Sequence, residues 1–214
     1  CAAGPEGRFT HELVVPFTVD RTAASARTSE GVRAPPHRAA CLPRSFAEGT
    51  EWLFAKAYVS STAADDLLRD LAPHFDRLTA AGAMDRFFFV RYSDPFFHLR
   101  LRVHGDPARL RTHVLPVLSS GARRYMAQGV GWRFQLDTYQ REIERYGGDA
   151  GIETCEQIFC ADANAVLRII GDLTGDEPAD IRWQLALLGM DRLLDDLGLT
   201  LDERISTLSA MAGT

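Results

Sequence analysis

The segment from His98 to His104 holds the residues whose types and spacing best fit chemistry. It reads His-Leu-Arg-Leu-Arg-Val-His, and this strict alternation predicts a β-strand. Successive side chains of a strand point to opposite faces, so the two histidines share one face with Arg100 and Arg102, roughly 7 Å apart along the strand. Guanidinium groups hold carboxylates or phosphates through paired hydrogen bonds. The stripe therefore predicts an anion-binding cradle; the alternative is a strand face that water or structural carboxylates neutralise.

A second group of charged residues, Glu142 and Arg145, lies in the segment Tyr-Gln-Arg-Glu-Ile-Glu-Arg-Tyr-Gly-Gly at 139–148. The two residues are three apart, so in a helical turn they share a face. Alone, such a pair is a surface ion pair that contributes little stability. Because the segment follows an expected strand that can lie near the arginine strand, we expect the pair to border the same cradle.

The cysteines and the other histidines do not have the spacing of a metal site. Cys155 and Cys160 are five residues apart, which points them in different directions on a helix. Four scattered cysteines are too few for a disulfide scaffold and are typical of reduced thiols in a cytosolic protein. The remaining histidines stand alone in the sequence, at His11, His37, His74 and His113.

The composition excludes several classes of protein. The length of 214 residues predicts one domain, or one domain plus an appendage. Of these residues 46% are hydrophobic and 25% are charged, which is ordinary for a soluble globular protein. Lys and Arg number 24 against 29 Asp and Glu, and the net charge of -5 does not draw the whole chain to nucleic acid or anionic lipid. Charges interrupt every apolar run, so no membrane span is expected. The signature of an RNA-recognition module is absent as well.

A sheet is expected to position these segments, because the predicted elements follow the order strand, helix, strand, strand, helix, strand. This order is typical of the ferredoxin-like split βαβ arrangement, an α+β fold whose antiparallel sheet carries two helices on one face. Three more helices form an all-helical extension. Thr62 with Asp65 has the spacing of a capping box at a helix start. Thr200 with Glu203 repeats that spacing. The strands are expected at 51–60, 86–92, 98–104 and 132–139, the sheet helices at 62–82 and from 107 with a kink at Pro116, and the last helices at 153–170, 178–197 and 200–212.

The first part of the chain differs in composition from the rest. Residues 11–18 form a strand-like run, and residues 19–50 are polar and irregular, which is typical of a linker. We therefore expect residues 1–48 to be the end of a preceding domain plus a flexible linker, and residues 49–214 to be the main domain. Because the chain opens on Cys1 without the layout of a signal peptide, we expect it to be a piece of a longer product.

Four motifs in this order resemble one known family. They are Trp52-Leu53 at a strand start, Phe-Phe-Phe-Val-Arg-Tyr-Ser-Asp-Pro at 87–95, His-Leu-Arg-Leu-Arg at 98–102 and Tyr-x-x-Glu-x-Glu-Arg-Tyr-Gly-Gly at 139–148. They are similar to the carboxy-terminal elimination domain of lantibiotic dehydratases, also called the thiopeptide-type bacteriocin biosynthesis domain. The similarity spans residues 50–170. Within it, Phe159-Cys-Ala-Asp162 resembles the family's Phe-x-x-Asp-Ser with Ala163 in place of Ser. Outside it, residues 11–17 resemble the last strand of the preceding glutamylation domain.

The resemblance implies a lyase that acts on a ribosomally made precursor peptide. In this family the large domain esterifies Ser or Thr with glutamate from glutamyl-tRNA. The small domain then removes the α-proton and expels glutamate, which leaves dehydroalanine or dehydrobutyrine. Its implied site residues are Arg91, Arg100 and Arg102, which bind the glutamyl carboxylates or the developing charge, with Glu142 and Arg145 completing the catalytic set.

The resemblance also implies the setting of the reaction. The partners are the leader-core precursor peptide and a glutamylation domain in cis or in trans, with a cyclase as a further candidate. The reaction is expected in the cytoplasm, without metal or organic cofactor, and glutamyl-tRNA is used by the separate glutamylation domain.

The sequence departs from the family in one respect. The family places a catalytic histidine near the end of the domain, whereas this sequence has no histidine after His113. Either the domain is truncated at its carboxy terminus or another group is the base, and His98, beside the arginines, is then the candidate. Two alternatives stay open: a stand-alone pyridine synthase, which joins two dehydroalanines, and a non-catalytic binder of an acidic peptide. The Arg and Glu motifs favour glutamate elimination over pyridine synthesis.

Overall fold

The computed structural model describes residues 2–4, 7–9, 42–173 and 178–212. The chain divides into two compact units, Cys1–Ala40 and Cys41–Thr214. In the first unit, β1 (Ala2–Gly4) and β2 (Gly7–Phe9) pair antiparallel. The strand expected at 11–18, and the expected linker up to residue 41, lie outside the described residues.

The division between the units falls before the boundary near residue 48 that the composition predicts. β3 (Ser45–Phe46) pairs antiparallel with β8 (Tyr139–Gln140), and the Phe46 side chain is buried. The prediction of a flexible linker through residue 48 is therefore wrong for β3, which belongs to the second unit. A strand of two residues has too short a pattern to be recognised in a polar segment.

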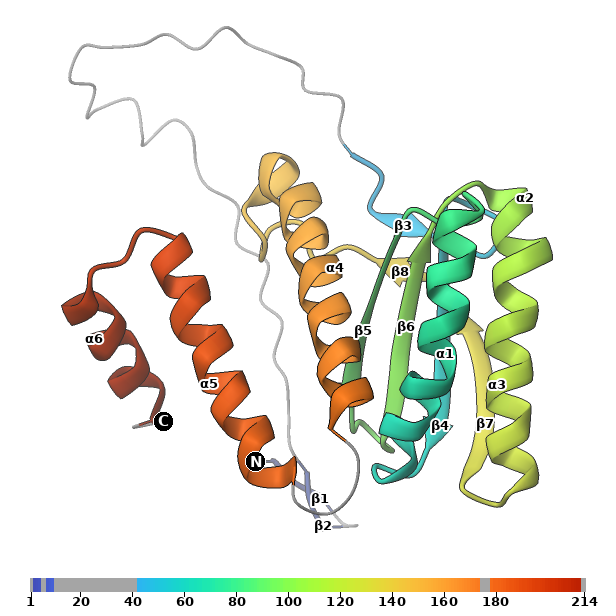
Figure 1. The fold of residues 1–214 in the computed structure, drawn as a ribbon, viewed down its shortest axis with the longest axis horizontal. Helices are drawn as coiled ribbons and strands as arrows, with labels where there is room; N and C mark the ends of the chain where they lie inside the picture. Colours follow the sequence, from blue (N-terminus) through green and yellow to red (C-terminus); the bar gives the residue numbers. More distant parts are fainter. Residues whose placement is uncertain (1, 5–6, 10–41, 174–177, 213–214) are drawn as a thin grey trace, which may run out of the picture. The chain divides into compact units, whose positions relative to one another are not determined.

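The second unit is built on a four-stranded antiparallel sheet with the strand order β5-β6-β4-β7 (Figure 1). Along the chain, a helix connects β4 to β5, a short turn connects β5 to β6, and a second helical segment connects β6 to β7. The predicted ferredoxin-like split βαβ arrangement and the α+β class are thus confirmed. The strands are β4 (Trp52–Val59), β5 (Arg86–Tyr92), β6 (His98–His104) and β7 (Gly131–Asp137).

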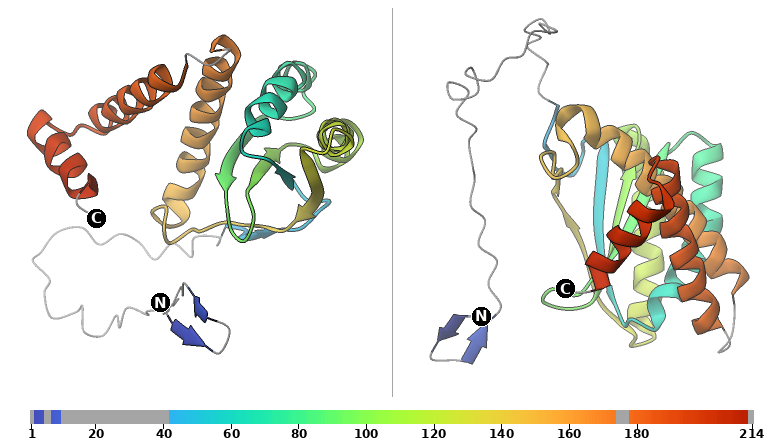
Figure 2. Two further views of the ribbon diagram at one scale, coloured as in Figure 1. Left: turned by 90° about the horizontal axis from the view of Figure 1, so that it is seen from below. Right: turned by 90° about the vertical axis from the view of Figure 1, so that its left-hand side faces the viewer.

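Two helices, α1 (Ala63–Ala80) and α3 (Leu115–Ala127), cover one face of this sheet (Figures 1 and 2). Leu99, Leu101 and Val103 of β6 are almost fully buried in the core between the sheet and these helices. Because the three apolar residues occupy alternate positions of β6, the polar residues between them lie on the opposite face.

The segment that connects β6 to β7 begins as predicted and contains an irregular turn. Asp106 is the N-cap, and its carboxylate accepts a 2.9 Å hydrogen bond from the backbone N–H of Arg109. From α2 (Pro107–Arg109) the chain passes through a π-helical turn, Leu110–Val114, into α3. The irregularity therefore lies just before Pro116, whose missing N–H disturbs the regular hydrogen-bond pattern of a helix.

The all-helical extension follows the sheet, as the sequence predicts. α4 (Gly148–Asp172) runs beside β5 and also contacts α1 (Figure 2). α5 (Pro178–Asp196) and α6 (Leu201–Ala212) complete it. Within the described ranges, no helix has both the length and the apolar character needed to cross a membrane.

Candidate functional site

The polar residues of β6 lie on the sheet face turned away from α1 and α3, as the alternation predicts. In the register of the sheet, Arg100 stands opposite Lys56 of β4. Arg102 stands between Phe54 of β4 and Phe88 of β5. One arginine is therefore next to another cation, and the other arginine is next to aromatic rings.

The Arg102 side chain is enclosed by three aromatic rings. Its guanidinium carbon lies 4.6 Å from the ring centre of Phe54, 5.2 Å from that of Phe88 and 4.9 Å from that of Tyr139. Its Nε is buried without a hydrogen-bond partner, and no carboxylate of the described residues forms an ion pair with it. Burial lowers the pKa of this guanidinium, and the charge of Arg100 adds to that effect. A partly buried cation without an ion-pair partner suits a site for an anion.

Arg100 is held by its neighbours on the same face. Its guanidinium carbon lies 3.4 Å from the ring centre of Tyr92, and its Nε donates a 3.1 Å hydrogen bond to Nε2 of His98. The buried His98 ring stacks on Tyr58, and its Nδ1 donates to the carbonyl oxygen of Phe96 at 2.8 Å. Both ring nitrogens are thus engaged in the neutral form. Burial lowers the pKa of His98, so the imidazole is neutral at pH 7.

Lys56 forms an ion pair with Asp137 of β7 on the same face of the sheet. The hydrogen bond from Lys56 is the main cause that lowers the pKa of Asp137, which therefore stays ionised. Asp137 neutralises Lys56 in this way. The positive charges of Arg100 and Arg102 remain without a paired carboxylate among the described residues.

Glu142 and Arg145 form the predicted ion pair, with 2.8 Å between the Arg145 Nη1 and the Glu142 Oε2. Both side chains are largely exposed, in the turn that follows β8. The charge of Glu142 counteracts the lowering of the Arg102 pKa that burial causes. Tyr139, at the start of β8, forms one wall around Arg102. The predicted ion pair is thus confirmed, and the position of the pair at the border of the cradle stays a prediction, which the effect of Glu142 on Arg102 supports.

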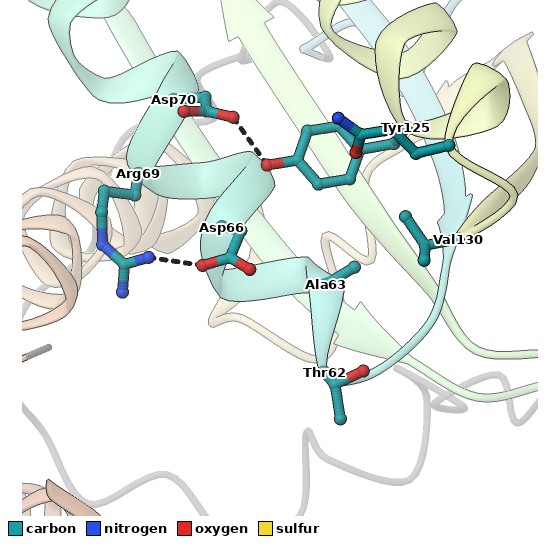
Figure 3. A pocket seen from close by; sticks show the side chains of 8 residues that line it. Thr62, Ala63, Asp66, Arg69, Asp70, Tyr125 and Val130 are labelled. Carbon is teal, nitrogen blue, oxygen red and sulfur yellow. Dashed lines mark hydrogen bonds and ion pairs between the residues drawn. The ribbon is translucent and has the colours of Figure 1, made fainter. Parts of the chain in front are cut away.

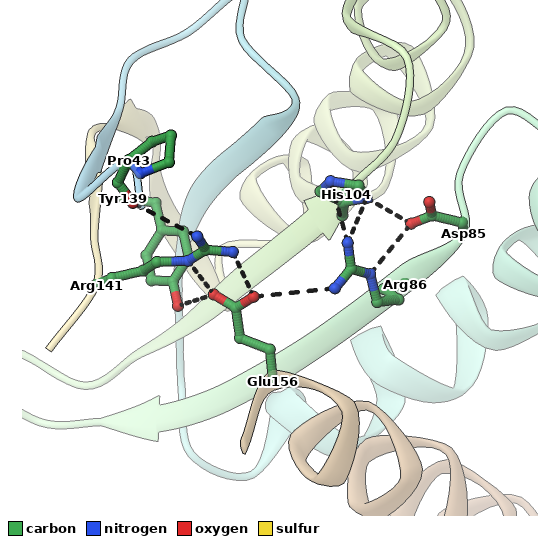
Figure 4. A network of polar contacts seen from close by, with 7 residues as sticks. All are labelled: Pro43, Asp85, Arg86, His104, Tyr139, Arg141 and Glu156. Carbon is green, nitrogen blue, oxygen red and sulfur yellow. Dashed lines mark hydrogen bonds and ion pairs between the residues drawn. The ribbon is translucent and has the colours of Figure 1, made fainter. Parts of the chain in front are cut away.

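A buried carboxylate, Glu156 of α4, holds this segment in place (Figure 4). Its Oε1 accepts hydrogen bonds from the Tyr139 hydroxyl at 2.9 Å and from Nε of Arg141 at 2.6 Å. Its Oε2 accepts a hydrogen bond of 2.7 Å from Nη2 of Arg141, and Arg86 of β5 approaches to 4.0 Å. Burial raises the pKa of Tyr139 and the charge of Glu156 adds to it, so the hydroxyl keeps its proton and donates it to this bond.

Arg91 lies on the other face of the sheet, away from the arginines of β6. It stands opposite Leu99, on the face that α1 and α3 cover. There it forms an ion pair with Asp65 of α1, and Asp65 also pairs with Arg182 of α5. The substrate-binding residues expected from the resemblance are thus not brought together: two of them share the cradle, and Arg91 does not.

Two cavities lie elsewhere on the molecule. One, of about 490 Å³, lies between α1 and the end of α3 (Figure 3). Its acidic residues are already paired: Asp66 with Arg69 at 2.5 Å, and Asp70 with the hydroxyl of Tyr125 at 2.6 Å. The other, of about 940 Å³, is largely apolar and lies between α4 and α5. In the part of the chain that the structure describes, no three His, Cys, Asp or Glu side chains are grouped so as to hold a metal ion.

Residues 52–214 match the family described as lantibiotic biosynthesis dehydratase C-term. The match includes every strand of the four-stranded sheet and the turn with Glu142 and Arg145. The chain belongs to this family. Its similarity to the nisin biosynthesis protein NisB of Lactococcus lactis subsp. lactis is 32% identity over 186 residues, which cover 83% of this chain and 17% of that protein. The subtilin biosynthesis protein SpaB of Bacillus subtilis is 29% identical over 159 residues, with coverages of 74% and 15%.

A solved structure is similar in fold to this lantibiotic dehydratase C-terminal chain. It is the tRNA dependent lantibiotic dehydratase MibB from Microbispora sp. 107891, with a TM-score of 0.52 and 34% identity. The similarity covers 61% of this chain and 13% of the MibB chain. The chain described here therefore spans less than a fifth of the length of each of these relatives.

Sequence reasoning missed Lys56, Arg141 and Glu156. Lys56 had a signal, since it is the one charged residue in the run Trp-Leu-Phe-Ala-Lys-Ala-Tyr-Val of β4. Arg141 stands inside the motif at 139–148, but its spacing from the other charged residues there does not distinguish it from a solvent-exposed arginine. Glu156 had no signal, because on an amphipathic helix a lone glutamate is expected to face solvent.

Proposed function

We propose that the chain acts in the dehydration of Ser and Thr residues of a ribosomally made precursor peptide, and that its own step is the elimination of glutamate from a glutamylated residue. Membership of the lantibiotic dehydratase family supports the first part. The observation that carries the second is Arg102, a partly buried guanidinium with a buried Nε, aromatic walls and no carboxylate ion-pair partner within the described ranges. A glutamyl ester brings a free carboxylate, which a guanidinium binds through charge-assisted hydrogen bonds.

The elimination couples a proton transfer to the loss of a carboxylate. A base removes the α-proton of the esterified residue, and the electron pair forms the Cα=Cβ double bond while the Cβ–O bond breaks. Glutamate leaves as an anion. Negative charge therefore develops on the neighbouring carbonyl oxygen and on the leaving carboxylate. Fixed cationic donors stabilise such charge most strongly where water is excluded, and the rings around Arg102 reduce its contact with water.

The side chains divide these tasks by position. Arg100 and Arg102 bind the glutamyl carboxylate and the developing charge, and the pair Glu142–Arg145 borders the site on its exposed side. His98 orients Arg100 through the hydrogen bond to Nε. To act as the base, His98 would have to release that bond, because its other ring nitrogen donates to a backbone carbonyl. The geometry therefore favours orientation over proton transfer for His98.

The proposal implies partners before and after this step. A glutamylation domain, fused or separate, makes the glutamyl ester from glutamyl-tRNA, and the chain binds the esterified precursor peptide in the cytoplasm. A cyclase that consumes dehydrated residues is a further candidate. The elimination transfers no electrons to an acceptor, so the step requires no redox cofactor.

The first experiment incubates the chain with a Ser-glutamylated model peptide and follows glutamate loss by mass spectrometry, beside Arg100→Ala. The matched control is Arg123→Ala, which removes an exposed arginine of α3. We expect glutamate loss with the wild type and the control, and a glutamylated peptide that stays intact with Arg100→Ala. Release at the wild-type rate by Arg100→Ala would exclude the role given to this residue.

A binder of acidic peptide without turnover is the second candidate, because an unpaired guanidinium binds an anion whether or not a reaction follows. The same samples separate the two functions. A binder leaves the ester intact in every sample and has a Kd for the glutamylated peptide that rises in Arg100→Ala. An enzyme releases glutamate and accumulates the glutamylated peptide only in that variant.

A further inference from the structure

We infer that Glu156 is a positioning residue that sets the geometry of the arginine site through Tyr139 and Arg141; the inference rests on the proposed elimination. Glu156 is 0% exposed and lies on α4, outside the motifs that carry the family resemblance. Among the described residues, its carboxylate accepts hydrogen bonds from Tyr139 and Arg141 and forms a longer ion pair, of 4.0 Å, with Arg86 (Figure 4). The carboxylate thereby joins α4 to the segment that forms a wall of the site.

The path from Glu156 to Arg102 runs through the Tyr139 ring. This ring lies 4.9 Å from the Arg102 guanidinium carbon, and its centre lies 5.9 Å from that of Phe46 and 5.2 Å from that of Trp52. Packing alone allows a ring to slide, whereas the hydrogen bond from its hydroxyl to Glu156 fixes one end. Because Arg102 has no hydrogen bond of its own to the described residues, it depends on such walls for its orientation.

The path from Glu156 to the turn runs through Arg141. Glu156 accepts hydrogen bonds from both Nε and Nη2 of Arg141, and the backbone N–H of Arg141 donates to the carbonyl oxygen of Arg44 at 2.8 Å. The backbone and the side chain of Arg141 are thus both fixed. The turn with Glu142 and Arg145 starts at the next residue, so its position relative to Arg102 is set from here.

A role in stability alone does not account for this arrangement. Burial of a carboxylate and guanidinium groups is costly, and apolar residues of similar volume are often as stable as a buried ion pair. The core on the other face of the sheet is built in that way, from Leu99, Leu101 and Val103. The polar network of Glu156 joins α4 to β8 and β5, which supply two of the rings around Arg102, and it continues through Arg86 to His104 and Asp85. It therefore lies where the orientation of Arg102 has a function.

The test is a double-mutant cycle on glutamate release from the Ser-glutamylated peptide. Tyr139→Phe removes the hydroxyl and keeps the ring, while Arg141 still pairs with Glu156, so this variant retains most of its stability. We expect kcat to fall about tenfold, with KM within about twofold of the wild type, as for a lost orienting hydrogen bond. In an Arg102→Lys background, the same substitution should change kcat by less than about twofold, because the guanidinium that it orients is gone.

Two further variants complete the test. Glu156→Gln, assayed well below its own melting temperature, should lower kcat about 100-fold, as expected for a displacement of about 1 Å at the site. Asp65→Asn breaks an ion pair on the other face of the sheet and should leave kcat unchanged. It controls for the loss of a partly buried, ion-paired carboxylate away from the site.

The possible results are distinct. Equal effects of Tyr139→Phe in the wild-type and Arg102→Lys backgrounds would mean that the hydroxyl acts independently of Arg102, and would overturn the inference. A wild-type chain that binds the peptide without releasing glutamate refutes the proposed elimination. The Kd of the glutamylated peptide, measured by calorimetry for the same four proteins of the cycle, then decides the positioning role. A wild-type chain that neither binds nor eliminates overturns both.

Discussion

Arg91 and Arg102 lie on neighbouring strands of one sheet but on its two opposite faces. They differ in whether a carboxylate of the fold pairs with the guanidinium. Arg91 faces α1 and has a carboxylate partner, Asp65. Arg102 faces away from α1, is enclosed by rings, and has no carboxylate partner in the described part of the chain. A cation that is neutralised by a carboxylate of the same protein has a structural role. A partly buried cation that forms no ion pair with the described residues is available to bind an anionic ligand.

The largest contrast should come from the same substitution made on the two faces. Arg102→Ala should lower kcat for glutamate release about 100- to 1,000-fold, the loss typical of a removed donor to a developing charge. Arg91→Ala should leave kcat within about twofold, since it removes only one partner of Asp65 outside the site. Both rates are measured by mass spectrometry at saturating peptide. Equal losses would mean that the two faces are not functionally distinct.

The opposite contrast should come from Asp65, whose carboxylate pairs with both Arg91 and Arg182. Asp65→Ala leaves two arginines without their partner, and should lower the free energy of unfolding by about 1–2 kcal/mol, less than for a fully buried pair because the arginines are partly in water. Urea titration at pH 7 measures this loss, and glutamate release should stay at the wild-type rate. A fall in release at unchanged stability would contradict a structural role for Asp65.

Arg102→Met should make the protein more stable while it removes function. Methionine fills the space between the rings without a charge that must be desolvated, so the free energy of unfolding should rise by about 1 kcal/mol. Thermal melts of the two proteins side by side test this. A lower melting temperature would show that the guanidinium is neutralised within the fold, and would remove the difference between the two faces.

His98→Gln should have a smaller effect than either arginine substitution. The glutamine amide oxygen can accept the hydrogen bond from Arg100, so kcat should fall only about threefold. If His98 were the base, the loss would exceed about 100-fold and the pH–rate profile would lose one limb. The profile of the variant against the wild type between pH 5 and 9 distinguishes these outcomes.

The smallest effect is expected on the free energy of unfolding when the pH is lowered. Burial alone would raise the pKa of Asp65, but the hydrogen bonds from Arg91 and Arg182 outweigh it and hold the pKa below its ordinary value of 3.8. The ion pairs therefore contribute stability above pH 3.8, and that contribution is lost as pH falls through the pKa of the folded state. The wild type should lose more unfolding free energy than Asp65→Asn between pH 5 and 3. Parallel losses would contradict the assignment.

The sequence was a good guide where a local pattern decides the structure. The alternation of β6 predicted which side chains share a face, and the ion pair of Glu142 with Arg145 followed from their spacing. The capping box at Thr200 and Glu203 is confirmed, since the N–H of Glu203 and the Thr200 hydroxyl and N–H are engaged within the pair.

The sequence was a poor guide where a distant partner competes with a local one. The capping box expected at Thr62 and Asp65 is wrong, because arginines from β5 and α5 take the Asp65 carboxylate. The N–H of Ala63 is satisfied by the Ser60 hydroxyl instead, at 3.2 Å. The role of Glu156 cannot be predicted from the sequence for the same reason. Its partners lie on other elements, and these come together only in the complete fold. Ion pairs between residues far apart in the chain produce no periodic pattern in the sequence, so the sequence does not predict them.

The short strand β3 has a practical consequence for anyone who shortens or transplants this domain. It lies before residue 52, where the family match begins, yet the Phe46 ring stacks on Tyr139 and the Pro43 carbonyl accepts a 3.4 Å hydrogen bond from Arg141. A domain cut at Trp52 would expose the Tyr139 ring to water and take away two backbone acceptors of Arg141. A boundary chosen from the fold would keep the chain from Leu42 onward.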